Sequence, residues 1–180
     1  MANVSTKKVA LSGMVGNILE WYDFTLYGYL AVILSKLFFP SDNEVVSLLA
    51  SFGAFAVGFF FRPLGSVILG YVGDKYGRKK ALIISIFLMA FPTFFIGLLP
   101  TYNDIGILAP ILLIILRILQ GISTGGEYTT SVSFVVEHSP DEKRGFYGSI
   151  NLLGAVIGIM FGSLMGAFLT SVFDKESLEA

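Results

Sequence analysis

The sequence predicts an all-α integral membrane protein with about five transmembrane helices. Apolar residues make up 54% of the chain, charged residues only 14%, and the mean hydropathy is +0.77. A soluble domain needs more charge than this to cover its surface. The apolar residues also gather in segments near or above the ~20 residues that cross a ~30 Å hydrocarbon layer. We therefore expect a helical bundle that spans a membrane.

Polar breaks with turn-forming residues divide the apolar sequence into five candidate spans. The breaks are PSDNE at 40–44, DKYGRKK at 74–80, PTYND at 100–104 and EHSPDEKR at 137–144. We expect the spans at approximately 13–39, 45–70, 81–99, 107–136 and 145–173, in a single transmembrane domain over residues 1–180. The first run is too long for a signal peptide and carries two acids, so it is expected to be a retained helix.

Basic residues predict the orientation of these spans. They concentrate before the first span and in the second and fourth breaks, as Lys7, Lys8, Lys75, Arg78, Lys79, Lys80, Lys143 and Arg144. The other side carries only Lys175 and Lys36, the latter near a helix end. By the positive-inside rule, the N-terminus is cytoplasmic. We expect a multi-pass protein of the cell inner (plasma) membrane.

Composition argues against several classes of function. The net charge of −1 gives no general attraction to nucleic acid, so no nucleic-acid partner is expected. The absence of cysteine excludes disulfides, thiolate metal sites and cysteine nucleophiles. The single histidine, His138, follows an acid in a charged loop. No nucleophile–base pair or set of metal ligands is apparent, so neither an enzyme nor a metal site is expected.

Five charged residues lie inside the predicted spans: Glu20, Asp23, Arg62, Arg117 and Glu127. Such residues usually face a cavity or pair with one another, and they mark ion, proton or substrate paths. At ~1.5 Å per residue, Glu20, Asp23 and Arg117 approach the middle of the membrane. Arg62 and Glu127 share a depth nearer the cytoplasmic side. Depth therefore predicts two pairs, Glu20 or Asp23 with Arg117, and Arg62 with Glu127. A purely structural tie between helices is the alternative for the second pair.

Helical spacing arranges polar residues in two stripes. The first span carries Asn17, Glu20, Asp23 and Tyr27 at steps of three or four, and the fourth carries Arg117, Gln120 and Thr124. At matched depth, the two stripes predict a substrate or proton cavity between these spans. Gly121 and Gly125, four residues apart, would let another helix approach closely.

The second break contains the motif that carries a family resemblance. Within GYVGDKYGRKKAL (70–82), the pattern Gly70, Gly73, Asp74, Gly77, Arg78 and Lys79 resembles the signature of the major facilitator superfamily. Four segments resemble its metabolite:proton symporter branch: GNILEWYDFTLYGYL (16–30), AVGFFFRPLGSVILGYVGDKYGRKKAL (56–82), RILQGISTGGEY (117–128) and VVEHSPDEKRGFYGS (135–149). That branch includes proline/betaine, 2-oxoglutarate, citrate and shikimate transporters, and this chain is most similar to the proline/betaine group.

The resemblance implies a fold and a function. The fold would be a major facilitator N-terminal half-bundle. The function would be proton-coupled symport of a small polar metabolite or osmolyte, such as proline, betaine or an organic acid. Glu20, Asp23 and Arg117 would line the central cavity, and Asp74, Arg78, Glu137 and Arg144 would form a cytoplasmic gate. The expected partners are the solute, H+ and the lipid bilayer. The coupling proton is expected, and no cofactor.

Length sets this chain apart from the family. Family members have two six-helix halves with the cavity between them, whereas this sequence ends after the fifth predicted span. The resemblance therefore implies an N-terminal fragment, with a second chain as a possible source of the missing half. The alternative is a non-transporting remnant or an accessory membrane protein from a truncated or split transporter gene.

Overall fold

The computed structural model describes residues 6–173, without the side chains of residues 6–9 and 129, and its regular structure there is entirely helical. The elements are α1 (Thr6–Phe38), α2 (Glu44–Phe60), α3 (Arg62–Tyr76), α4 (Arg78–Ile96), α5 (Tyr102–Ile105), α6 (Leu108–Glu137), a 3-10 turn (Asp141–Lys143) and α7 (Arg144–Val172). The predicted all-α class is confirmed. The Lys7, Lys8 and Lys175 side chains, which entered the orientation argument, lie outside the described part.

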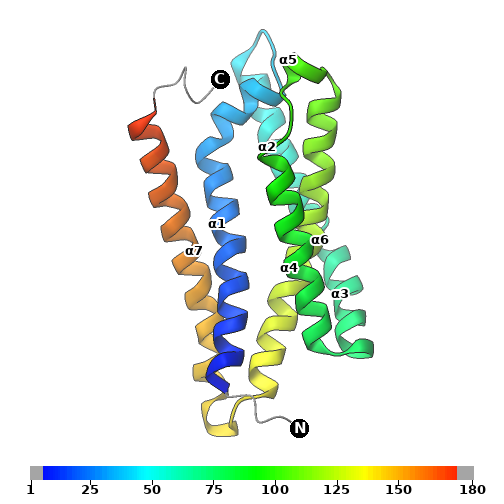
Figure 1. Ribbon diagram of the computed structural model, residues 1–180, viewed down its shortest axis with the longest axis vertical. Helices are drawn as coiled ribbons and strands as arrows, with labels where there is room; N and C mark the ends of the chain where they lie inside the picture. Colours follow the sequence, from blue (N-terminus) through cyan, green and yellow to red (C-terminus); the bar gives the residue numbers. More distant parts are fainter. Residues whose placement is uncertain (1–5, 174–180) are drawn as a thin grey trace.

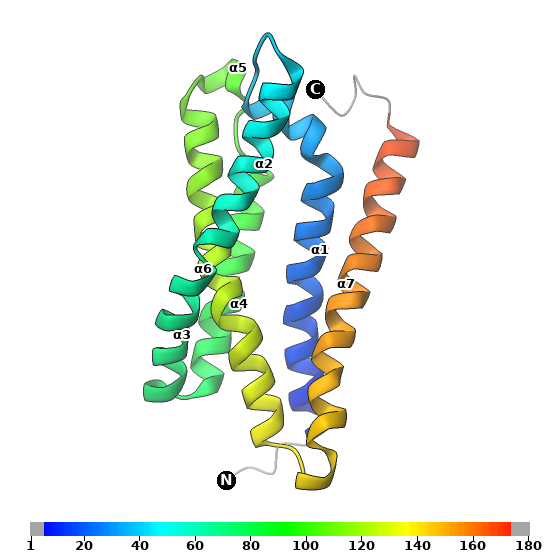
Figure 2. The same cartoon turned by 180° about the vertical axis from the view of Figure 1, so that it is seen from behind.

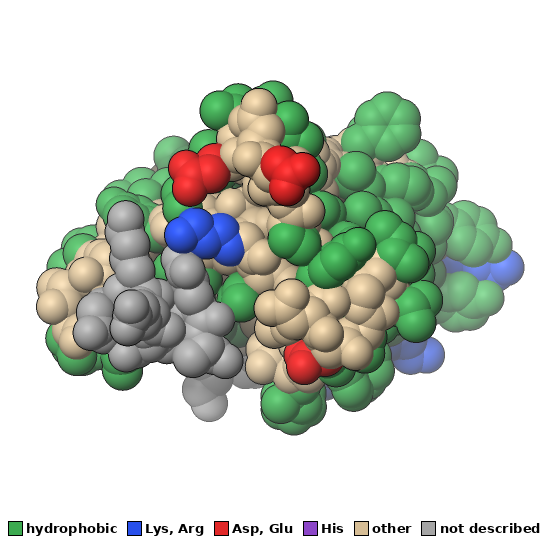
Figure 3. All heavy atoms as spheres, turned by 90° about the horizontal axis from the view of Figure 1, so that it is seen from above, with side chains coloured by type: hydrophobic (Ala, Val, Ile, Leu, Met, Phe, Trp, Pro, Cys, Tyr) green, Lys and Arg blue, Asp and Glu red, His purple; other side chains and the backbone are tan. Residues whose placement is uncertain are grey.

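The long helices run side by side along the longest axis of the molecule (Figures 1 and 2). Helix α6 contacts α1, α2, α3, α4 and α7, while α1 makes its most extensive contact with α7. The turns between α3 and α4 and between α6 and α7 lie toward the lower end in Figure 1. Figure 3 views the upper end and shows acidic and basic side chains on its surface. The segments that meet there carry exposed Lys36, Asp42, Glu44 and Asp104. This asymmetry agrees with the charge distribution used to orient the spans.

Four segments in the described residues are long and apolar enough to cross a membrane. They are Glu44–Tyr76, Arg78–Ile96, Leu108–Glu137 and Asp141–Val172. Large hydrophobic side chains cover their outer faces, Phe60 and Val67 among the most exposed. Helix α1 contains the first predicted span and is also long enough, but Asn17, Glu20 and Asp23 lower its hydropathy. Its crossing of the membrane stays a prediction.

The second predicted span is two helices rather than one. Helix α2 ends at Phe60, and α3 begins at Arg62 with Pro63 in its first turn. Proline has no backbone N–H to donate to the preceding turn, so the helix breaks there. The expected segment 45–70 is therefore corrected to a broken pair that continues to Tyr76. Because of the break, Arg62 stands at the start of a new helix.

Glycines line two close helix crossings. Along α7, the residues that face α1 are Gly154, Gly158, Gly162 and Gly166, and a Cβ on any of them would meet α1 atoms at 2.9 Å or less. On α6, a Cβ on Gly121 or Gly125 would collide with the carbonyl oxygens of Gly58 or Arg62. The predicted close approach at Gly121 and Gly125 is confirmed. Small residues at such crossings let helix backbones meet.

The turn between α3 and α4 gives a test of the glycine motif. Gly77 has φ 97° and ψ 143°, a conformation that a side chain disfavours. We expect Gly77→Ala to lower the free energy of unfolding by about 1–2 kcal/mol. Gly70→Ala is the matched control, because Gly70 is helical and has no atom within 4 Å of its added Cβ. Equal stability of the two variants in detergent unfolding would contradict the argument.

Candidate functional site

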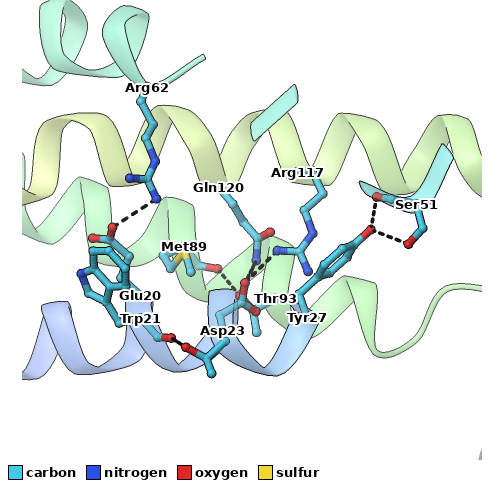
Figure 4. A network of polar contacts seen from close by, with 11 residues as sticks. Glu20, Trp21, Asp23, Tyr27, Ser51, Arg62, Met89, Thr93, Arg117 and Gln120 are labelled. Atoms are coloured by element: carbon cyan, nitrogen blue, oxygen red, sulfur yellow. Dashed lines mark hydrogen bonds and ion pairs between the residues drawn. The ribbon is translucent and has the colours of Figure 1, made fainter. Parts of the chain in front are cut away.

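The centre of the site is an ion pair between α1 and α6. The Arg117 Nη1 donates to Asp23 Oδ2 at 2.8 Å, and the two side chains are only 4% and 14% exposed. The Arg117 guanidinium also lies 4.0 Å from the centre of the Tyr27 ring. The Tyr27 hydroxyl donates to the Ser51 carbonyl of α2 at 3.0 Å (Figure 4). The first of the two predicted pairs is therefore formed, with Asp23 rather than Glu20.

Helix α4 joins this pair through an amide. The Gln120 Nε2 donates to Thr93 Oγ1 at 2.7 Å and lies 3.5 Å from Asp23 Oδ2. Asp23 thus accepts from Arg117 and Gln120, both on α6, and Gln120 reaches α4 at the same time (Figure 4). The sequence did not single out Thr93 or Ser51, because a lone hydroxyl residue in an apolar helix carries no distinctive pattern.

The second predicted pair is wrong. Arg62 Nη2 lies 3.5 Å from Glu20 Oε1, with no ion pair between Arg62 and Glu127 in the described structure. The guanidinium stacks over Phe24 and Phe59, at 4.5 and 4.0 Å from their ring centres. Glu127 instead lies against Gly16 of α1. Depth locates a charge along the membrane normal, but it does not say which side of the helix the charge occupies.

Asn17 also departs from its predicted place in the cavity. Its Nδ2 donates to the Asn151 carbonyl of α7 at 2.6 Å, and Asn151 bonds in turn to Ser131 of α6. At 100° per residue, Asn17 and Asp23 point about 120° apart around α1. The stripe of four residues is therefore too wide to face one cavity, and Asn17 ties α1 to α7.

Two cavities flank the contact between α1 and α6, where the sequence predicted one. A cavity of about 340 Å³ between α1, α4 and α6 is lined by Asp23, Tyr22, Thr93 and Glu127, among others. A groove of about 680 Å³ between α1, α2–α3 and α6 is lined by Glu20, Trp21, Phe59, Arg62, Pro63, Ser66, Thr124, Gly125 and Tyr128. Of the predicted cavity residues, Asp23 and Glu20 therefore border different spaces.

Three of the four predicted gate residues meet at the C-terminal end of α3. Arg78 Nη2 lies 2.9 Å from Asp74, and its Nε lies 3.6 Å from Glu137 at the end of α6. Arg144 is not part of this cluster, because it pairs with Asp141 one turn away at 2.9 Å. The cluster joins the α3–α4 turn to α6. The predicted role of these residues in gating stays a prediction.

The site offers charged groups and aromatic rings. Within residues 6–173, no group of three or more His, Asp or Glu side chains could hold a metal ion. The available groups are three carboxylates, two guanidinium groups and the rings of Trp21, Tyr27 and Tyr128. Such a set can hold a small charged solute and can exchange a proton at a carboxylate.

Comparison with known proteins identifies the family of the chain. The profile of the family described as sugar (and other) transporter matches residues 9–178. The proline/betaine transporter of Salmonella typhimurium is 44% identical, and that of Escherichia coli is 45% identical; each match covers 95% of this chain and 34% of the relative. The glycine betaine/proline/ectoine/pipecolic acid transporter of Dickeya dadantii is 43% identical, and the match covers 97% of this chain and 35% of that relative. The chain spans about a third of these relatives. No solved structure matches it.

Proposed function

Because the chain belongs to the sugar (and other) transporter family of the major facilitator superfamily, we propose that it works in proton-coupled symport of small zwitterionic osmolytes. The family and the named relatives are transporters, which confirms that the chain is not an enzyme. Bacterial relatives and the apolar helices confirm the predicted inner-membrane, multi-pass setting. The names of the relatives support a proline- or betaine-like solute.

The observation that carries this proposal is the Asp23–Arg117 pair. It joins α1 to α6, and both side chains are largely removed from solvent. A proton that binds Asp23 Oδ2 cancels the charge that attracts Arg117 and takes the place of its hydrogen bond. Arg117 keeps its charge and its contact with the Tyr27 ring. Protonation would thus loosen α1 from α6, and release of the proton would join them again.

The cavity of a complete transporter needs a second wall. The relatives are about three times as long as this chain, which supports a cavity completed by a further helical half. That half would come from a longer form of the same chain or from a second chain. A remnant that no longer transports is the competing possibility, and uptake measurements separate the two.

The test is uptake of radiolabelled glycine betaine into vesicles under an imposed proton gradient. Two preparations are compared, the chain alone and the chain joined to the C-terminal two thirds of the Escherichia coli relative. We expect the joined protein to accumulate betaine and a protonophore to abolish the accumulation. Uptake in neither preparation, with both proteins inserted in the membrane, would overturn the proposal.

We also propose a role for the cluster of Asp74, Arg78 and Glu137. In one transport state it would hold the α3–α4 turn against the end of α6. Exposed ion pairs contribute about 0–1 kcal/mol to stability. We therefore expect Arg78→Gln to change the free energy of unfolding by less than about 1 kcal/mol while it reduces uptake by the joined protein at least about tenfold. Lys80→Gln is the control, because no ion pair to Lys80 is formed in the described residues. Unchanged uptake by Arg78→Gln would exclude this role.

A further inference from the structure

A second polar site lies in the groove between α1, α2–α3 and α6. Its charged centre is Glu20 with Arg62, and it does not include Asp23 or Arg117. Figure 4 shows the two pairs side by side, with Arg62 reaching down to Glu20 and Arg117 to Asp23. The break at Phe61 produces this arrangement, since it places Arg62 at the start of α3 rather than inside a continuous helix. The groove therefore offers a binding site of its own.

The charged groups of this groove have unused hydrogen-bonding atoms. The Glu20 side chain is 3% exposed, and its Oε2 has no hydrogen-bond partner. On Arg62, Nε and Nη2 are likewise buried and make no hydrogen bond, although Nη2 lies 3.5 Å from Glu20 Oε1 in the ion pair. Leaving such charged groups unsatisfied in a buried place costs free energy, so native structures usually provide a partner. One acceptor and two donors at the same place are therefore without a hydrogen-bond partner, which fits a ligand that carries both charges and toward which these side chains can turn.

Aromatic rings complete the groove. Phe24 and Phe59 stack on the Arg62 guanidinium and hold it in place. Trp21 and Tyr128 line the groove on α1 and α6, and Tyr128 is 45% exposed, so it has ring surface to offer. The face of an aromatic ring attracts alkylated ammonium groups, and a fully alkylated one has no N–H with which to form a hydrogen bond. The rings thus stand beside the one carboxylate that could balance such a cation.

We propose that the Glu20–Arg62 groove binds a small zwitterion in which a carboxylate lies close to an alkylated ammonium group. The ligand carboxylate accepts from Arg62 Nε and Nη2, and its ammonium group lies between Glu20 Oε2 and the rings of Trp21 and Tyr128. The Asp23–Arg117 pair then remains for the proton. This assignment rests on the proposed function and adds to it where the solute binds and which of its groups are recognised.

Ligand analogues test the assignment on the unaltered protein. The chain, alone and joined as above, is placed in nanodiscs of phosphatidylethanolamine and phosphatidylglycerol, and labelled glycine betaine is displaced by three competitors. Proline keeps both charges, 3,3-dimethylbutyrate replaces the betaine nitrogen by carbon, and choline lacks the carboxylate. We expect proline to compete, and the other two to compete at least about tenfold more weakly, because each leaves one charged partner unmatched. Equal competition by 3,3-dimethylbutyrate would overturn the assignment.

Variants then locate the site. Glu20→Gln, Arg62→Lys and Trp21→Ala are each expected to raise the Kd for glycine betaine about tenfold. Glu142→Gln, an exposed acid in the α6–α7 turn, is the control and is expected to bind normally. Trp21 is only half-buried, so its variant keeps the test valid if a charge variant fails to fold.

The outcomes separate the two proposals. Normal binding by all three variants would overturn the groove assignment and leave the proposed transport function intact. Absence of betaine binding in both preparations would overturn both, and the uptake assay would then fail as well.

Discussion

Arg117→Gln is expected to cause the largest loss of stability of any single charge removal in the described part of the chain, about 3–5 kcal/mol. The substitution leaves the Asp23 carboxylate, 14% exposed, without its guanidinium partner. It also removes the cation that lies on the Tyr27 ring. The free energy of unfolding in detergent, followed by tryptophan fluorescence of Trp21, measures the effect.

A double-mutant cycle separates the pair from other consequences of losing the arginine. In Asp23→Asn/Arg117→Gln, two neutral amides replace the two charges, so no buried charge is left alone. We expect the double variant to recover at least half of the stability lost by Arg117→Gln. A double variant that is as unstable as the sum of the single variants would show that the two side chains act independently.

Gly125→Ala is expected to have the second-largest effect. An added Cβ would collide with the backbone carbonyl of Arg62, and backbone cannot yield as a flexible side chain can. We expect a loss of about 1–3 kcal/mol as α3 moves away from α6. The same displacement would carry Arg62 from Glu20 and so weaken glycine betaine binding. Unfolding and binding are measured on the same preparation.

Gly53→Ala on α2 is the matched control. Gly53 is helical like Gly125, but no atom lies within 4 Å of its added Cβ. Alanine favours a helix over glycine by up to about 1 kcal/mol, so this variant should be as stable as the native chain or slightly more so. If both variants lost stability equally, close approach of α3 and α6 would not be what Gly125 provides.

The features that the sequence predicted correctly depend on composition, on spacing along a helix and on depth in the membrane. The helical class and four of the five spans follow from the distribution of apolar residues, and the structure contains them. The pairing of Arg117 with an acid on α1 follows from depth, because charges near the middle of a membrane need partners. The close crossing at Gly121 and Gly125 follows from their spacing. Each of these features depends on a short stretch of sequence or on position along the membrane normal.

What could not be predicted depends on rotation about the helix axes. Glu20 and Asp23 are one turn apart, yet they pair with arginines from different helices. Arg62 reaches Glu20 because α2 and α3 break at Phe61, and a proline indicates a break without giving its direction. Glu127 was assigned to Arg62 by depth alone, although Gly16 makes room for it against α1. Tertiary packing decides these contacts.

The surroundings of the two charge pairs differ, and this difference supports a separate role for each pair. Asp23–Arg117 lies among Tyr27, Gln120 and the backbone of α2, where a change of charge acts on helix contacts. Glu20–Arg62 borders the larger groove, where unused charged atoms and aromatic rings suit a zwitterion. On these two proposals, one of the two acids of α1 serves the proton and the other serves the solute.

The most direct measurement is the proton movement that accompanies betaine uptake at Asp23. Glycine betaine is added to weakly buffered vesicles that contain the joined protein, and the external pH is recorded together with uptake. The account predicts that the external solution becomes alkaline as betaine enters. It predicts that Asp23→Asn abolishes the pH change and net accumulation while betaine exchange continues. Betaine accumulation without a pH change, or an undiminished pH change in Asp23→Asn, would contradict the account.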